Sequence, residues 1–140
     1  MSLKHAMDVS VSAIEAERLR MEVISSNIAN INTTRSLNGG PYRRLSVSLY
    51  EKNISFSDAL NLAEKRLNGV GAKIVEDTTP FKKVYKPSHP DADKDGFVET
   101  PNVDLASEMV DLTEASRGYE AQITAYNATK KMIQDLIQLP

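Results

Sequence analysis

The distribution of glycine and proline along the chain is the feature that most limits what it can fold into. Ten of the twelve glycines and prolines lie between Gly39 and Pro101, residues 1–38 contain none, and residues 102–139 contain only Gly118. A sandwich, a barrel or an evenly spaced βαβ series needs turns throughout, so this distribution argues against all three. The sequence predicts a mainly α protein, with long terminal helices flanking a small β-containing insert (α+β).

Apolar residues in the N-terminal stretch recur at the spacing of a helix that lies along another helix. Met7, Ile14, Met21 and Ile28 are seven residues apart, which is the heptad repeat of coiled coils. A run of Ser, Asn and Thr follows, and these residues compete for backbone hydrogen bonds, so they favour a helix end. The pattern predicts a helix over roughly residues 5–30.

The C-terminal stretch repeats this pattern over a longer distance. Positions seven apart hold Leu105, Leu112, Tyr119, Tyr126 and Ile133, and the alternate positions include Met109, Ile123 and Ile137. Asp104 precedes the stretch and is of the residue type that caps a helix N-terminus. The pattern predicts a long helix that begins at Leu105 and pairs with the N-terminal helix as a coiled coil.

The two apolar seams are too long for the rest of the chain to cover. Burying one seam contributes about 12–24 kcal/mol gross, whereas ordering the helix costs about 1–2 kcal/mol of backbone entropy per residue. We therefore expect the terminal helices to pair and their outer faces to meet other subunits. In this interpretation residues 1–38 and 102–140 form a discontinuous coiled-coil assembly domain, and residues 39–101 form a small outer lobe.

The insert itself shows short alternating runs separated by turn residues. These runs predict strands within residues 42–50, 73–76, 81–85 and 96–99, with the second and third on either side of a Thr-Pro turn. Residues 55–68 carry apolar residues on one helical face and predict a short helix. We expect a mixed α/β lobe.

Composition excludes several classes of function. No apolar run is long enough to cross a membrane, and the N-terminus lacks the continuous apolar segment of a cleaved secretory signal. The chain has no cysteine and a net charge of −2, which exclude thiol chemistry and a general attraction to nucleic acid. It contains no phosphate-binding glycine loop, nucleophile elbow or zinc-ligand spacing. We expect no catalytic residue, cofactor, metal or small-molecule substrate.

One acidic segment of the insert has two interpretations. Asp91, Asp93, Asp95 and Gly96 match the first half of an EF-hand calcium loop. The twelfth position should be glutamate but is Asn102, and two prolines just upstream exclude the entering helix. Asp-Gly is also a strong turn signal. A solvated turn is favoured, and a calcium-responsive module is the alternative.

Motifs along nearly the whole chain resemble a known family. Residues 26–34 contain Ser-Asn-Ile-Ala-Asn followed by Asn-Thr-Thr, which is similar to the N-terminal signature of bacterial flagellar rod and hook axial proteins. Residues 101–121 contain Pro-Asn-Val-Asp-Leu and Ala-Ser-Arg-Gly-Tyr-Glu-Ala, which resemble the C-terminal signature of that family. Within it, residues 39–44 and 89–98 are similar to the short proximal-rod members.

The resemblance implies a non-enzymatic structural subunit of the flagellar basal-body proximal rod. The terminal helices would form the coiled-coil inner layer of a helical tube that transmits torque from motor to hook and filament. Partners would be further copies, other rod subunits, and components of the membrane ring and the export gate. The chain would reach the periplasm by type III export without a cleaved signal. A cytosolic coiled-coil adaptor or export chaperone is the alternative function.

We expect the assembly interface at the two seams and the two signatures. The expected residues are Met7, Ile14, Met21, Asn27, Ile28, Asn30, Asn32, Thr33, Asn102, Asp104, Leu105, Met109, Leu112, Arg117, Gly118, Tyr119, Ile123, Tyr126 and Ile133. Asn27 and Asn30 either hydrogen-bond the backbone of a neighbouring subunit or cap their own helix.

Two residues of the C-terminal signature have specific expectations. Arg117 either forms an ion pair across an interface or pairs with Glu114 or Glu120 of its own helix. Gly118 costs an isolated helix roughly 1 kcal/mol relative to alanine. A glycine at this position is therefore a candidate close-approach point between helices.

Overall fold

Two long helices and four short strands make up the described part of the chain in the computed structural model, which covers residues 3–36, 39–52 and 69–138. The elements are α1 (Leu3–Ala29), β1 (Leu45–Lys52), β2 (Gly69–Glu76), β3 (Lys82–Tyr85), β4 (Phe97–Thr100) and α3 (Leu105–Ile137). The strands form two separate two-stranded sheets. The predicted mainly α architecture with a β insert is confirmed.

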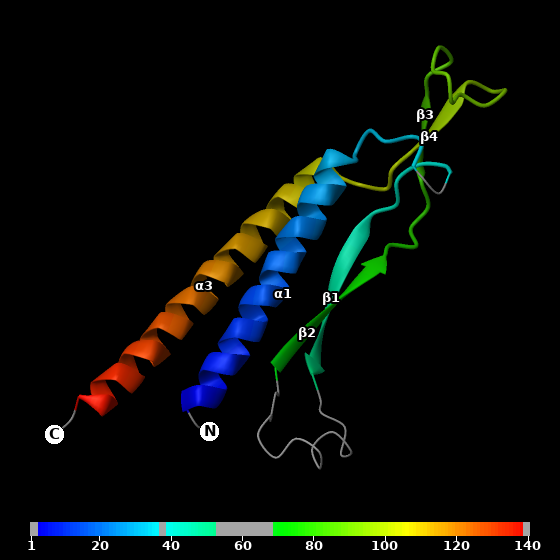
Figure 1. Cartoon of the computed structure of the whole chain (residues 1–140). Helices are drawn as coiled ribbons and strands as arrows, with labels where there is room; N and C mark the ends of the chain where they lie inside the picture. The colour runs from blue at the N-terminus through cyan, green and yellow to red at the C-terminus, as the bar shows by residue number, and fades with distance from the viewer. Residues whose placement is uncertain (1–2, 37–38, 53–68, 139–140) are drawn as a thin grey trace, which may run out of the picture.

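The helices α1 and α3 lie side by side and run in opposite directions, so both ends of the chain lie at one end of the molecule (Figure 1). As predicted, α3 begins at Leu105, and the carboxylate of Asp104 caps it by accepting a hydrogen bond from the Ser107 backbone N–H at 3.1 Å. The predicted packing of the terminal helices on each other is confirmed. Their coiled-coil geometry stays a prediction.

The face that α3 buries differs in part from the expected seam. Leu112 and Tyr119 are half-buried, as the heptad pattern predicts. Of the alternate positions, Ile123 is half-buried but Met109 is 56% exposed, and the neighbouring row places Glu108 and Ala115 fully buried. Two adjacent rows of a helix share the same three-four spacing, so periodicity alone does not select between them. Here the buried row carries a carboxylate and a small residue, which a search for apolar residues passes over.

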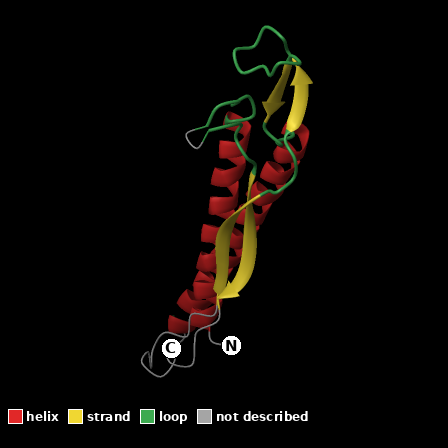
Figure 2. Cartoon of the chain, turned by 90° about the vertical axis from the view of Figure 1, so that its right-hand side faces the viewer, coloured by secondary structure: helices red, strands yellow, loops and turns green. Residues whose placement is uncertain are grey.

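A twisted ribbon made of β1 and β2 covers another side of α1 (Figure 2). The strands are antiparallel, with Leu45 opposite Glu76 at one end and Lys52 opposite Gly69 at the other. At the Gly69 end, the Ser12 hydroxyl of α1 accepts a hydrogen bond from the Val70 backbone N–H at 3.0 Å. Helix α1 is therefore the central element, with α3 and the ribbon both packed on it.

The second sheet lies beyond the end of the helix pair (Figure 1). Its strands β3 and β4 are antiparallel, and the rings of Tyr85 and Phe97 meet edge to face with centroids 5.3 Å apart. The strands predicted at 73–76 and 81–85 are present, but they belong to different sheets. The helix predicted at residues 55–68 lies outside the described residues.

Candidate assembly interface and its buried polar cluster

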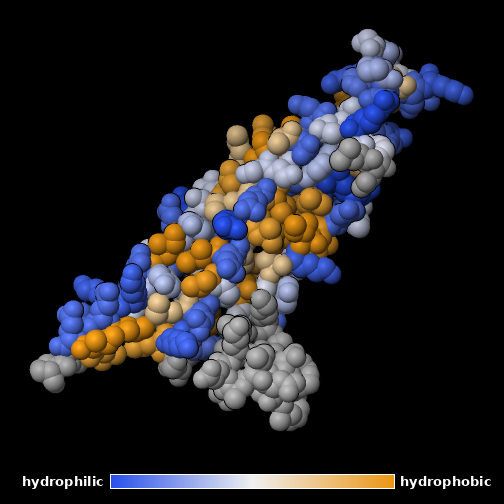
Figure 3. Space-filling view, viewed as in Figure 1, coloured by the Kyte–Doolittle hydropathy of each residue, from blue (hydrophilic) through white to orange (hydrophobic). Residues whose placement is uncertain are grey.

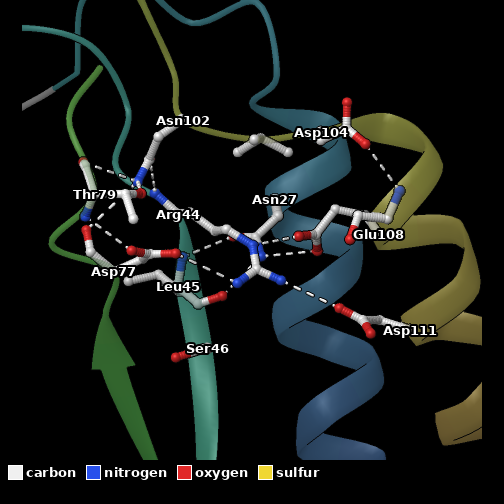
Figure 4. Close-up of polar contacts among 12 residues, drawn as sticks. Asn27, Arg44, Leu45, Ser46, Asp77, Thr79, Asn102, Asp104, Glu108 and Asp111 are labelled. Atoms are coloured by element: carbon white, nitrogen blue, oxygen red, sulfur yellow. Dashed lines mark hydrogen bonds and ion pairs between the residues drawn. The ribbon is translucent and has the colours of Figure 1, made fainter. Parts of the chain in front are cut away.

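A cluster of polar side chains joins the end of α1, the start of β1 and the first turns of α3 (Figure 4). We call this set the polar cluster; its members are Asn27, Arg44, Asp77, Asn102, Glu108 and Asp111. The side chains come from four segments that are distant in sequence: the end of α1, the residue before β1, the segment after β2, and residues 102–111. The cluster therefore connects the two helices to each other and to the insert.

Asn27 of α1 is the most completely bonded residue of the cluster. Its amide nitrogen donates to the Leu45 carbonyl at 2.8 Å and to the Glu108 carboxylate at 3.0 Å. Its amide oxygen accepts from the Leu45 N–H at 3.0 Å and from the Tyr42 hydroxyl at 3.0 Å. The side chain thus uses its full hydrogen-bonding capacity while its exposed fraction is 0%. Asn27 ties the end of α1 to the first residue of β1 and to α3.

Arg44 supplies the positive charge of the cluster. Its Nε donates to the Glu108 carboxylate at 2.6 Å, and its two terminal nitrogens lie 3.2 Å from Asp111 and 3.5 Å from Asp77. Partial burial acts to lower the pKa of Arg44, but the hydrogen bond and charge of Glu108, together with the charge of Asp111, outweigh it and raise that pKa. Glu108 is fully buried, so its carboxylate depends on Arg44 and Asn27 for compensation.

Asn102 and Asp77 extend the cluster toward the second sheet. The amide oxygen of Asn102 accepts from the Arg44 backbone N–H at 2.8 Å, and its nitrogen donates to the Thr79 hydroxyl oxygen at 2.8 Å. Asp77 accepts from the Thr79 backbone N–H at 2.9 Å. The backbone and side-chain hydrogen bonds from Thr79, followed by Arg44, hold the pKa of Asp77 below its usual value. The segment after β2 is thereby fixed to the segment that enters α3.

The structure gives the two asparagines of the N-terminal signature different roles. Asn27 neither caps its own helix nor reaches the surface, so its bonds are made within one chain. Asn30 does bond its own helix end, donating to the Ser26 carbonyl at 2.9 Å and accepting from the Thr33 hydroxyl at 3.2 Å. Asn102 and Asp104 likewise make their bonds within the chain.

The expected roles of Arg117 and Gly118 have separate outcomes. Arg117 is exposed, and the described residues provide it with no ion pair. Glu114 lies instead 3.8 Å from Arg20 of α1. The Glu17 side chain of α1 lies over Gly118, where an added Cβ would be 3.2 Å from the Glu17 Cδ. Gly118 is therefore a close-approach point between α1 and α3 of the same chain.

Apolar residues remain uncovered at both ends of α3, as the space-filling view shows (Figure 3). We call them the exposed apolar groups; the first holds Leu105, Met109 and Val110, and the second holds Met132, Leu136 and Ile137. Sequence analysis missed Val110, Met132 and Leu136. Their signal was present, because a helix with apolar residues on more than one face has more than one partner.

The charged members of the cluster were also missed, and for them the sequence carries little signal. Arg44 follows another arginine just before a strand, and Glu108 is one of several acids spaced three residues apart on α3. Solvated residues show the same patterns. Arg44 and Glu108 differ from solvated residues only in their contact with each other. That contact depends on how the chain folds between them.

The acidic segment of the insert forms a bonded turn. Asp91 accepts hydrogen bonds from Arg35 at 2.6 Å and from the Thr34 hydroxyl at 3.0 Å. Asp93 accepts from the backbone N–H groups of residues 95 and 97 at 3.0 and 2.8 Å. Gly96 has φ +80°, which favours glycine at this turn. The two carboxylates thus serve different partners, and the described residues contain no cluster of three potential ligands for a metal ion.

Neither α1 nor α3 contains a stretch long and apolar enough to cross a bilayer.

Comparison with known proteins assigns the two ends of the chain to one class. A family described as "Flagella basal body rod protein" matches residues 7–35, and one described as "Flagellar basal body rod FlgEFG protein C-terminal" matches residues 94–139. The matched regions contain α1 and α3 with the polar signatures at their ends. The class that fold and sequence define is therefore that of flagellar basal-body rod proteins, whose role is structural.

Relatives that match over nearly the whole chain identify one family within this class. The flagellar basal-body rod protein FlgC of Bacillus subtilis is 46% identical over 148 residues, with 99% of each chain covered. FlgC of Borreliella burgdorferi is 40% identical and FlgC of Salmonella typhimurium 34% identical, each alignment covering 99% of this chain and 98% of the relative. The chain belongs to the FlgC family. It is a structural subunit of the flagellar basal-body rod, and neither the adaptor nor the calcium-module alternative gains support from these relatives.

Proposed function

We propose that this subunit polymerises into the proximal segment of the rod through its terminal helices, with residues 39–101 as an outer layer. The observation that carries the proposal is the pair of exposed apolar groups on α3. The chain's own α1 and ribbon pack elsewhere, so these groups are available to neighbouring copies and other rod subunits.

The free energy available from burying these exposed side chains supports assembly. Fully burying one large apolar side chain contributes about 1.5–3 kcal/mol. Val110 and Met132 are 59% and 55% exposed, so each has more than half of its possible burial still to gain. Such groups recur in every copy of a polymer, so small gains per residue add along the tube. Their position at both ends of α3 favours contacts with more than one neighbour.

The mechanical role follows from the same contacts. Torque delivered to one copy passes to the next through side-by-side helices, with no bond made or broken. We propose type III export without a cleaved signal, location in the periplasm, and contact with membrane-ring and export-gate components. These proposals rest on family membership, and no substrate or cofactor takes part in them.

A paired substitution at one position tests the interface. Val110→Glu places a charge in the first exposed apolar group, and Val110→Met keeps the position apolar. Both replacements are better helix formers than valine, so neither weakens α3 by itself. In cells that lack their own copy, we expect the Glu variant to be absent from purified basal bodies and the cells to be non-motile. The Met variant should assemble and support swimming.

Two further measurements separate the interface proposal from the proposed location in the rod. Circular dichroism of both purified variants should match the parent chain, which separates failure to assemble from failure to fold. Recovery of the Glu variant in basal bodies at parental amounts would contradict the interface. Absence of the unmodified chain from the rod fraction would contradict the proposed location.

A further inference from the structure

We propose that the polar cluster is a register pin, which fixes the axial alignment of α1 against α3 and makes that alignment depend on strand β1. The inference concerns contacts within one chain, so it stands apart from rod assembly. It rests on two fully buried polar side chains, Asn27 and Glu108, that face each other across the helix pair at 3.0 Å.

Away from the cluster, two small residues lie on the side of α3 that packs on α1. Ala115 is fully buried, and Gly118 lies under the Glu17 side chain. A shift of one turn moves a helix by about 5.4 Å and presents a similar row of side chains. The heptad spacing therefore leaves neighbouring alignments close in energy, as in coiled coils where a buried polar residue selects one of them.

The cluster removes this ambiguity because its bonds exist in one alignment only. A slip of one turn separates Asn27 from Glu108 and takes the carboxylate away from Arg44. A buried carboxylate without its partner is strongly unfavourable, and so is a buried amide without hydrogen bonds. This free-energy cost applies only to the slipped alignments, so the polar cluster favours the native alignment.

Strand β1 completes the pin because it brings Arg44. The backbone of Leu45, the next residue, occupies two of the bonds of Asn27, and Asn102 holds the Arg44 N–H at 2.8 Å. Without β1 in place, the native alignment of the helices would bury Glu108 with no cation. The stability of the native helix alignment therefore depends on the ribbon being in place.

The contact between Glu17 and Gly118 provides an independent report of the alignment. It lies ten residues along α1 from Asn27, or about 15 Å at ~1.5 Å per residue, so it can be altered without touching the cluster. The chain contains no cysteine, so an introduced pair has no competing thiol.

The test compares disulfide formation in three double-cysteine versions of the full chain. Glu17→Cys with Gly118→Cys reports the native alignment, and it removes the side chain that lies over the glycine. Glu17→Cys with Gln122→Cys, or with Glu114→Cys, reports a slip of one turn in either direction. With the polar cluster intact, we expect the native pair to oxidise at least roughly tenfold faster than either slipped pair, a ratio equivalent to about 1.4 kcal/mol.

The same pairs are then placed in chains with an altered cluster. One chain carries Asn27→Leu, Arg44→Met and Glu108→Leu, which keeps the core filled with apolar side chains. We expect the oxidation ratio to fall below roughly threefold while circular dichroism shows the helices intact. If the triple variant fails to fold, Arg44→Met with Glu108→Gln serves as the second variant, because it retains a polar side chain at 108. Arg43→Met, which alters the neighbouring arginine outside the polar cluster, is the matched control and should leave the ratio unchanged.

Two results would overturn the register pin. One is a folded variant chain that keeps the full tenfold preference for the native pair. The other is an intact chain that shows no preference at all. Neither readout involves a rod, so either result leaves the proposed polymerisation standing, and a failure of polymerisation leaves the pin untouched.

Discussion

Replacing Arg44 by methionine gives a sharp test of how the polar cluster stabilises the fold. The change keeps an unbranched apolar side chain in place of the arginine stem and removes the guanidinium. Glu108, with an exposed fraction of 0%, then has no cation beside it. Removing one partner of a buried ion pair costs about 3–5 kcal/mol.

The other two partners of Arg44 add little to this figure. Asp77 and Asp111 are 24% and 33% exposed, so water and salt screen them once the arginine is gone. We therefore assign nearly all of the expected loss to Glu108. With an m-value near 2 kcal/mol/M in urea, a loss of about 3–5 kcal/mol lowers the unfolding midpoint by roughly 1.5–2.5 M.

Urea titration followed by circular dichroism measures this midpoint, and two variants serve as controls. Arg43→Met removes a neighbouring arginine that stacks on Phe81 at 4.5 Å and bonds the Asp77 carbonyl at 2.9 Å, and it should cost only about 0.5–1.5 kcal/mol. Adding Glu108→Gln to Arg44→Met removes the orphaned charge and should restore much of the loss. Equal midpoints for the two arginine variants, or no recovery with glutamine, would refute the reasoning.

Three further changes have defined outcomes. The Thr79 hydrogen bonds hold the pKa of Asp77 low, so its carboxylate contributes stability above the unfolded-state pKa of about 3.9, and this is lost as pH falls through the folded pKa. Asp77→Asn should therefore flatten the acid side of a stability-versus-pH curve, and an unchanged curve would count against it. Gly118→Ala should stabilise the fold by up to about 1 kcal/mol, seen as a higher thermal midpoint, because the flexible Glu17 side chain can move aside. Gly118→Val adds a branched side chain against Glu17 and should lower the thermal midpoint. Asp104→Ala should cost about 0.5–2 kcal/mol in urea unfolding, and Asp104→Asn, which can still cap, should cost less.

The sequence predicts the elements that depend on local pattern. Long stretches free of glycine and proline mark both helices, Asp104 marks the start of α3, and alternation marks the strands. Local pattern does not decide which row of α3 is buried, because the rows through Glu108 and Met109 have the same spacing. It also does not show that residues 73–76 and 81–85 belong to different sheets, since strand pairing depends on contacts distant in sequence.

The same distinction, between local pattern and contacts distant in sequence, applies to the residues of the candidate interface. Apolar positions such as Leu105 and Met109 are visible as a pattern, and the structure leaves both exposed. Asn27 is visible as part of a signature, but its bonds to β1 and α3 depend on three segments meeting. A motif can show that a residue matters without showing whether its partner lies within the same chain.

The antiparallel arrangement of α1 and α3 gives the molecule a direction. Residues 3 and 138 lie at one end of the helix pair, and the β3–β4 hairpin lies at the other (Figure 1). The 33 residues of α3 span about 50 Å at ~1.5 Å per residue. Labels attached to either end of the chain therefore report one pole, and a label in the turn near Asp95 reports the opposite pole. A pair of such labels shows which way each subunit points along an axis.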